Sequence, residues 1–282
     1  MDLSSPLAAL PIVLLGLILL IIVIGITWAG MRVGIKGAKS APAADSLEKD
    51  DDVNGAIVPA VLGLLALLLG FTFALAIDRF ETRRALVLEE ANAIGTAYLQ
   101  AQVLPQPHRE RVSALLVRYT DNRVVLARTE APEDRRQRLA DNDRTVNDIW
   151  AATLAGFDSI KGLDMSSAFV SSINAVIDLD TSRKTGRMAH VPEEVFWVLI
   201  VYVLVTAAIL GYTMRTRSSF HLACVMHVLV VMSLMLIIDI DRPAAGGIRE
   251  SQFPMELLSK SMHAEPRAAY DRWRTPATMP QE

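Results

Sequence analysis

Hydrophobic residues in this chain are concentrated in four stretches that hold almost no charge. The stretches cover residues 7–29, 55–77, 195–213 and 219–238, and nearly all of the charged residues lie between them. A helix needs about 20 mostly apolar residues to cross a hydrocarbon core about 30 Å thick. Because backbone groups inside lipid must be hydrogen-bonded within the segment, each stretch predicts a membrane-spanning helix.

The second stretch continues into a helical pattern beyond its apolar part. Positions whose spacing alternates between four and three form a stripe that is apolar apart from one arginine. The stripe consists of Phe73, Ile77, Phe80, Arg84, Val87, Ala91, Ile94, Tyr98 and Ala101. No proline occurs between Val61 and Leu104, and Pro105 and Pro107 follow. We therefore expect the second membrane helix to leave the bilayer without a break and to end at these prolines.

Three further helices are predicted in the middle of the chain. One covers about residues 108–129, one begins at Pro132, one follows Gly162, and each has an apolar face. The predicted fold class is therefore all-α: a polytopic membrane protein with four transmembrane helices and a helical extramembrane domain. The expected boundaries are 1–29 for the N-terminal tail and first transmembrane helix, 30–54 for a linker, 55–103 for the second transmembrane helix and its stalk, 104–192 for the helical extramembrane domain, 193–239 for the third and fourth transmembrane helices, and 240–282 for a C-terminal tail.

Composition narrows the classes of function. The 282 residues include 28 Lys and Arg against 31 Asp and Glu, for a net charge of -3, which gives no support for nucleic-acid binding. The single cysteine, Cys224, cannot form an internal disulfide.

Orientation in the membrane stays undecided. Basic residues in the short connections favour an outward-facing helical domain, whereas basic residues at both ends of that domain reverse the count.

Several short motifs occur between about residues 50 and 258. They are 52–55 (DVNG), 89–98 (EEANAIGTAY), 239–243 (DIDRP) and 247–249 (GIR), together with Asn174 and Asp178. As a set they resemble the bestrophin-like family of bacterial integral membrane proteins, long catalogued as a domain of unknown function. The resemblance extends to the layout of bestrophins, which are pentameric anion channels. It implies a multi-pass protein of the bacterial inner membrane, a homo-oligomer with five subunits, and anions such as chloride as partners.

The second span holds the candidates for a pore. Gly63, Ala66, Gly70 and Ala74 form a stripe of small residues, which is typical of close helix packing or of a face turned to an oligomer axis. In bestrophins, apolar side chains on the second span form a narrow neck. By analogy with that neck, Phe73, Ile77 and Phe80 are gate candidates beside Gly63 and Gly70.

Charged residues collect where the second span leaves the membrane and where the fourth span ends. They are Asp78, Arg79, Arg83, Arg84, Asp239, Asp241 and Arg242. We interpret them as an interfacial network of charges that anchors both helix ends. The resemblance suggests an alternative, since bestrophins bind calcium through an acidic cluster after the fourth span. Two aspartates supply few oxygen ligands, so no metal is expected. Glu89 and Glu90, five positions after Arg84 and seven after Arg83, are expected to form salt bridges within the helical bundle rather than to act as paired catalytic carboxylates.

The sequence contains no phosphate loop, zinc-ligand spacing, nucleophile elbow or dinucleotide fingerprint. We therefore expect neither an enzyme nor a cofactor, and no catalytic residue is predicted. The leading hypothesis is a homo-oligomeric ion channel, anion-conducting, that is surrounded by membrane lipid and has the second transmembrane helix lining its pore. The alternative is a non-conducting membrane scaffold or sensor whose helical domain binds a partner protein.

Overall fold

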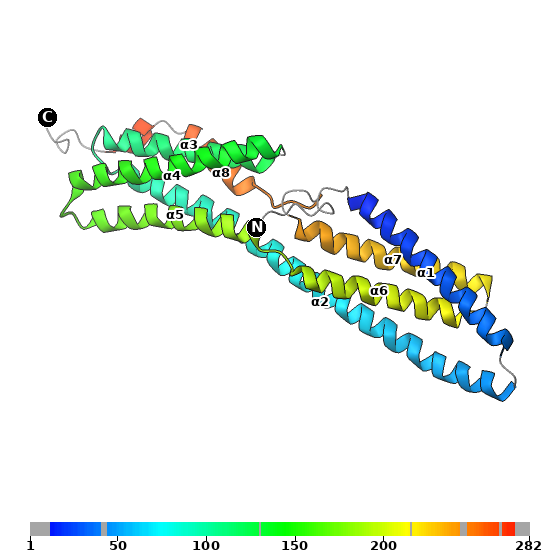
Figure 1. Cartoon of the computed structure of the whole chain (residues 1–282). Coiled ribbons are helices and arrows are strands. Elements are labelled where there is room, and N and C mark those ends of the chain that lie inside the picture. The colour runs from blue at the N-terminus through cyan, green and yellow to red at the C-terminus, as the bar shows by residue number, and fades with distance from the viewer. Residues whose placement is uncertain are drawn as a thin grey trace. The chain divides into compact units, whose positions relative to one another are not determined.

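The computed structural model of the chain describes residues 12–40, 44–129, 131–214, 216–242, 247–264 and 267–273. These residues form eight α-helices and one short 3₁₀-helix, and none of them lies in a strand. The elements are α1 (Ile12–Ser40), α2 (Ala44–Ala101), α3 (His108–Arg128), α4 (Pro132–Ile160), α5 (Met165–Met188), α6 (Glu193–Thr213), α7 (Arg217–Asp241), α8 (Phe253–Ala264) and η1 (Arg267–Asp271) (Figure 1). The predicted all-α fold class is confirmed.

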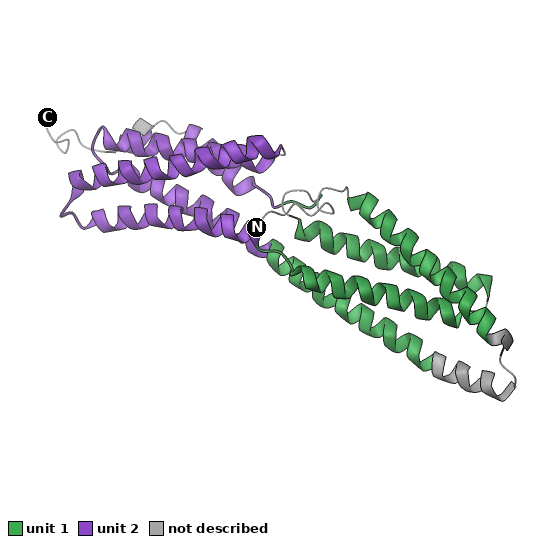
Figure 2. Cartoon of the chain, viewed as in Figure 1, with its two compact units in different colours: residues 1–80, 189–249 green, residues 81–188, 250–282 purple. Residues whose placement is uncertain are grey.

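The chain divides into two compact units, which Figure 2 shows in separate colours. We name residues 1–80 and 189–249 the membrane unit, and residues 81–188 and 250–282 the helical domain. Helix α2 contributes residues to both units, because it runs from Ala44 to Ala101 as one helix.

The membrane unit holds helices that are long and apolar enough to cross a bilayer. They are α1, the first part of α2, α6 and α7. The four predicted segments are thus confirmed by length and composition, apart from residues 7–11, which lie outside the described residues. Two local signals set where the last two helices begin. Pro192 stands directly before α6, and Thr216 caps α7 by accepting a hydrogen bond from Ser219 N at 3.3 Å. The chain is an all-α membrane protein.

Glycines bring α1 and α6 into close contact inside the membrane unit. A Cβ atom added to Gly34 would lie 2.2 Å from the carbonyl oxygen of Tyr212, and one on Gly211 would lie 2.2 Å from that of Thr27. Only a residue without a Cβ lets two helix backbones approach so closely, as is common in membranes. By contrast, a Cβ at Gly63 or Gly70 would have no neighbour within 4 Å. The small-residue stripe of α2 is therefore not a packing face against the other residues that the structure describes.

The helices extend beyond the boundaries that the apolar pattern predicts. Residues 30–54 were expected to be a linker, but α1 ends at Ser40 and α2 begins at Ala44, so most of this range is helical. The reason is that a drop in hydrophobicity marks where a helix leaves lipid. It does not mark where the helix ends, because Ala, Lys and Glu are themselves good helix formers.

The core of the helical domain is made by the end of α2 with α3, α4, α5 and α8. Its fully buried members include Ile94, Leu116, Tyr119 and Ile173. The stripe predicted for α2 is buried at Val87, Ala91, Ile94, Tyr98 and Ala101, as expected. It does not hold nearer the membrane, because Phe73 and Arg84 are exposed while Leu65, Thr72, Ala76 and Arg83 are buried.

The C-terminal segment, expected to be a tail, is part of the helical domain. Met255 and Met262 of α8 are 0% and 6% exposed and belong to the same core as Ile94. The ring of Tyr270 in η1 packs edge-on against Tyr98 of α2, with centroids 6.3 Å apart. These contacts replace the expected free tail with an integral helix.

Candidate functional site

One face of α2 is packed in the chain and the opposite face is open. Within the membrane unit, Leu65 packs with Val23 and Val203, whereas Gly63, Gly70 and Phe73 are exposed. Phe73 is 38% exposed. An exposed face of this kind needs either lipid or another protein surface to cover it.

Ile77 and Phe80 take an intermediate position on α2. Both are half-buried and pack beside the cluster of Ala76, Val191 and Ile237. Among the pore candidates, Gly63, Gly70 and Phe73 are therefore exposed, whereas Ile77 and Phe80 are half-buried.

The open face continues along α2 into the helical domain. Leu88 and Leu99 are 51% and 55% exposed there. Asn92 and Thr96, which lie between them in the sequence, are also exposed. Leu88 and Leu99 are about three helical turns apart and lie on one face of α2, where another helix could pack. The open surface of α2 is therefore not confined to the part that is apolar enough to span a membrane.

Asp239 and Asp241, at the end of α7, bind backbone groups. Asp239 accepts hydrogen bonds from the N–H groups of Gly247 and Ile248, at 2.7 and 3.0 Å. Asp241 accepts one from the N–H of Val191 at 3.0 Å, and its other oxygen lies 3.7 Å from His190 Nδ1. Both carboxylates therefore fix the segments around the ends of membrane helices. Within the described residues, no group of three or more His, Cys, Asp or Glu side chains could hold a metal ion.

The basic members of the predicted charge network have separate surroundings. Arg83 Nε lies 2.5 Å from Glu250, and both side chains are almost fully buried. Arg84 is exposed and pairs with Glu81 at 3.4 Å. Asp78 and Arg79 are exposed on α2. The contacts found for Arg83, Arg84, Asp239 and Asp241 are thus with residues that the prediction did not include.

A buried charge cluster lies at the centre of the helical domain. Glu90 of α2 is 0% exposed and accepts hydrogen bonds from Tyr119 Oη at 2.5 Å, from Arg123, and from Arg183. The ion pair with Arg123 has a closest distance of 3.0 Å. These partners come from α3 and α5, so Glu90 connects three helices. The salt bridges predicted for Glu90 in the bundle are confirmed.

Asp180 of α5 forms the other half of the cluster. It accepts hydrogen bonds from Asn142 at 2.8 Å, from Lys184 at 2.5 Å and from Tyr119 at 3.2 Å, and it lies 3.6 Å from Arg123. Sequence reasoning missed this half, because nothing in the spacing of these residues places α4 beside α5.

The cluster changes the protonation chemistry of its members. Burial, followed by the charge of Glu90, raises the pKa of Tyr119 well above its usual value, so the phenol stays a hydrogen-bond donor. Burial alone would lower the pKa of Arg123, but Tyr119, Glu90 and Asp180 raise it overall. The arrangement therefore holds fixed charges in place and is a structural cross-link between helices.

The comparisons with known proteins decide the family. A family model for the bestrophin-like domain matches residues 18–253. The chain belongs to the bestrophin-like family. Within this bestrophin-like chain, the motif residues Glu90, Asp239 and Asp241 each make polar contacts that are described above. No curated protein matches the sequence.

Solved structures resemble the bestrophin-like chain in fold. Two are variants of a bacterial bestrophin homologue from Klebsiella pneumoniae, at 14% and 15% identity. Both have a TM-score of 0.59, and the matches cover 87% and 88% of this chain and 94% and 96% of theirs. A third, described as a membrane protein, has a TM-score of 0.60 at 14% identity and covers 88% of this chain and 96% of its own. At such identities the similarity shows that the fold is shared.

Proposed function

We propose that this bestrophin-like protein is a homo-oligomeric ion channel in which α2 lines a central pore. The observation that carries the proposal is the open face of α2. Gly63 and Gly70 have no neighbour that a Cβ would meet, and Phe73 is exposed, although the opposite face of the helix is packed. Copies of the chain arranged around an axis would cover this face. The family and the fold similarity to bacterial bestrophin homologues support the same proposal.

The chemistry of the open face suits a gated pore. Small residues let copies of α2 approach closely. A ring of apolar side chains closes a pore by dewetting, without a moving plug. Phe73 would form the narrowest part, with Ile77 and Phe80 beside it. Five subunits, anion conduction and a multi-pass position in the bacterial inner membrane are proposed from the likeness to bestrophins.

The charged residues would set the depth of the helices in the membrane. Asp78, Arg79 and Arg84 are exposed just beyond the apolar part of α2, where long basic side chains reach the lipid–water boundary. Arg83, Asp239, Asp241 and Arg242 would complete this boundary region. Its role is to anchor helix ends, and it needs no metal.

Oligomer size and ion flux test the proposal together. The purified protein is weighed as a complex with detergent subtracted, and it is then reconstituted into vesicles that carry a chloride gradient. We expect a pentamer that dissipates the gradient, with the rate changed by Phe73→Ala and by Ile77→Ala. A monomer, or a flux that neither substitution alters, would contradict the proposal.

Cysteine labelling tests the lining directly. Cys224→Ser gives a background without cysteine, in which Phe73→Cys is compared with Leu222→Cys on α7. Both positions are exposed in the single chain, Leu222 at 73%. A membrane-impermeant thiol reagent should label Phe73→Cys and spare Leu222→Cys, because Phe73→Cys replaces the apolar ring and lets water into the pore, whereas Leu222 would face lipid. Equal protection of the two sites would mean that α2 faces lipid.

A scaffold or sensor remains the second candidate, because one observation favours it. The four membrane stretches contain no Asp, Glu, Lys or Arg, although most transport routes display some ionisable groups. A complex that forms a defined oligomer but holds the chloride gradient, with Phe73→Cys protected, would identify this alternative.

A further inference from the structure

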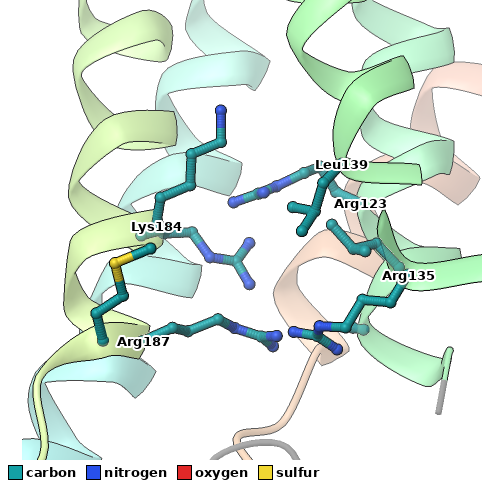
Figure 3. A pocket seen from close by; sticks show the side chains of 9 residues that line it. Arg123, Arg135, Leu139, Lys184 and Arg187 are labelled. Atoms are coloured by element: carbon teal, nitrogen blue, oxygen red, sulfur yellow. The ribbon is translucent and has the colours of Figure 1, made fainter. Parts of the chain in front are cut away.

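The helical domain contains a basic cavity of about 200 Å³ between α3, α4 and α5. Five cationic side chains line it, namely Arg123, Arg135, Arg183, Lys184 and Arg187, and its other lining residues are apolar. Figure 3 shows Arg187 of α5 and Arg135 of α4 extending toward each other from opposite walls. Arg123 points inward from α3 (Figure 3). Three helices thus direct positive charge at one small space.

Three of the five cations are neutralised by carboxylates of the buried cluster and its rim. Arg123 and Arg183 form ion pairs with Glu90. Lys184 Nζ lies 2.5 Å from both Asp143 and Asp180. The positive charge of these three residues is therefore balanced from the side of the helical core.

No carboxylate of the described residues forms such a contact with Arg135 or Arg187. Arg135 Nη1 donates to the carbonyl oxygen of Thr129 at 3.5 Å, a neutral acceptor. Within the described part of the chain, Arg187 forms no hydrogen bond or ion pair. Both residues are half-buried. Two guanidinium groups therefore face the same cavity, and neither is in contact with a carboxylate of the residues that the structure describes.

The arrangement destabilises the charged form of Arg187. Burial, followed by repulsion from Arg135 and Arg183, lowers the pKa of Arg187 to about 10, although the charge of Glu250 opposes this shift. Burial also lowers the pKa of Arg135; Glu250 opposes this shift and Arg123 adds to it. Both groups still carry their charge at neutral pH, so a negative ligand would relieve a repulsion that the fold contains.

We propose that this cavity binds a phosphate-type oxyanion between Arg135 and Arg187. Arginine presents several N–H donors in a planar fork that matches the oxygens of phosphate. The two forks approach from different helices, so one tetrahedral anion could accept from both. Bound there, the anion would tie α5 to α4 across the cavity.

The size of the cavity restricts the ligand. It equals about six or seven liquid water molecules at about 30 Å³ each, enough for one oxyanion and a few waters. It is smaller than the roughly 300–1,000 Å³ typical of pockets for drug-sized ligands. The anion is therefore free phosphate, or a phosphate group whose remainder lies outside. A phospholipid headgroup is one such group.

The first arm of the test uses inorganic phosphate on the purified full-length protein in detergent. The melting temperature is titrated with sodium phosphate against sodium chloride at equal ionic strength. We expect a saturable rise for the native chain. Arg135→Gln and Arg187→Gln should each weaken the apparent affinity by about tenfold or more, as for loss of a charge-assisted hydrogen bond. Arg136→Gln is the matched control, because Arg136 lies on α4, is exposed and pairs with Glu133.

The second arm distinguishes the two sources of phosphate. Melting is compared in bilayers of phosphatidylcholine with and without phosphatidic acid. A rise with phosphatidic acid that both cavity variants lose, together with no response to inorganic phosphate, assigns the site to a headgroup. A response to inorganic phosphate assigns it to a free anion. No response in either arm, or one that Arg135→Gln and Arg187→Gln retain, overturns the proposal.

Misfolding of the Arg135→Gln and Arg187→Gln variants can be distinguished from loss of phosphate binding. Each substitution removes a repelled charge, so the variants should melt no lower than the native chain in chloride. The readout is also independent of ion flux, so a failure here would leave the channel proposal standing.

Discussion

Glu90 is the residue whose replacement most directly tests the structure of the helical domain. Its carboxylate is fully buried and accepts hydrogen bonds from Tyr119, Arg123 and Arg183. The substitution Glu90→Gln keeps the shape and one acceptor oxygen. It removes the negative charge and places an amide NH₂ beside a guanidinium group. Two arginines would then lose their principal counter-charge inside a packed core.

The expected loss of stability follows from the partners that remain. Removing one member of a buried ion pair costs about 3–5 kcal/mol, because the other charge stays desolvated. Here Asp180 lies 3.6 Å from Arg123, so part of that charge stays compensated, and Gln252 accepts from Arg183 at 3.2 Å, so one donor of Arg183 stays hydrogen-bonded. We therefore expect the lower end, about 3 kcal/mol. At about 2–4 °C per kcal/mol, the melting temperature should fall by about 6–12 °C.

Intrinsic fluorescence of the detergent-solubilised protein is a suitable assay. Trp150 of α4 packs against the core of the helical domain and reports on its unfolding. Glu89→Gln is the matched control. It makes the same chemical change at the adjacent position, which is exposed, and should alter stability by no more than about 0.5 kcal/mol.

A clear result would refute this reasoning. If Glu90→Gln melts within about 2 °C of Glu89→Gln, the cluster does not hold the helices together as described. The double variant Glu90→Gln/Arg183→Gln adds a second check. It should be less destabilised than the sum of its single variants, by about 0.5–3 kcal/mol, because the two residues are in contact. Strict additivity would count against the ion pair.

Three further predictions follow from single features. Because the folded pKa of Arg187 lies near 10, below the ordinary 12.5, its charged form is penalised below about pH 10 and the penalty is relieved as pH rises further. In chloride, Arg187→Gln should thus raise the free energy of unfolding at pH 7–9 by on the order of 1–3 kcal/mol, as measured by denaturant titration. This gain over the native chain should shrink above about pH 10. A gain that stays constant with pH contradicts the charge argument. Met255→Ala should cost about 2–5 kcal/mol by thermal melting, whereas Leu257→Ala, exposed on the same helix, should cost little; equal effects would mean that α8 is not docked. Gly211→Ala should lower the yield and melting temperature of the membrane unit, because its Cβ would meet the backbone of α1. The control Gly25→Ala should be tolerated, since a Cβ there has no neighbour within 4 Å. A stable Gly211→Ala protein would disprove the close α1–α6 contact.

The helices from α1 to α7 and their order could be predicted from the sequence, because both signals are local. An apolar stretch long enough for a bilayer requires a helix whatever surrounds it. The prolines at 105, 107, 132 and 192 mark ends and beginnings near those of α2, α3, α4 and α6. The register of the buried stripe was only half right. Arg83 is buried and Arg84 is exposed. The buried partner of Arg83 is Glu250, which lies far along the chain and is not revealed by any local pattern.

The candidate site shows where sequence reasoning stops. Glu90 could be singled out as a bundle carboxylate, but its partners Arg123 and Arg183 depend on how α3 and α5 pack beside α2. The basic cavity depends on the same packing, since its lining comes from three helices. α8 was missed because it is short and follows a polar stretch. The pore-lining role of Gly63, Gly70, Phe73, Ile77 and Phe80 stays a prediction, because it concerns contacts beyond a single chain.

The docking of α8 also has a consequence for the order of events during synthesis. The helical domain is assembled from two separate segments, and the whole α6–α7 hairpin is encoded between them. Met255 and Met262 therefore leave the ribosome only after every membrane helix has been translated. Until then the nascent domain carries an uncovered apolar surface, a state that exposes a chain to aggregation or chaperone capture. The core of the helical domain can therefore be completed only after the α6–α7 hairpin has been synthesised.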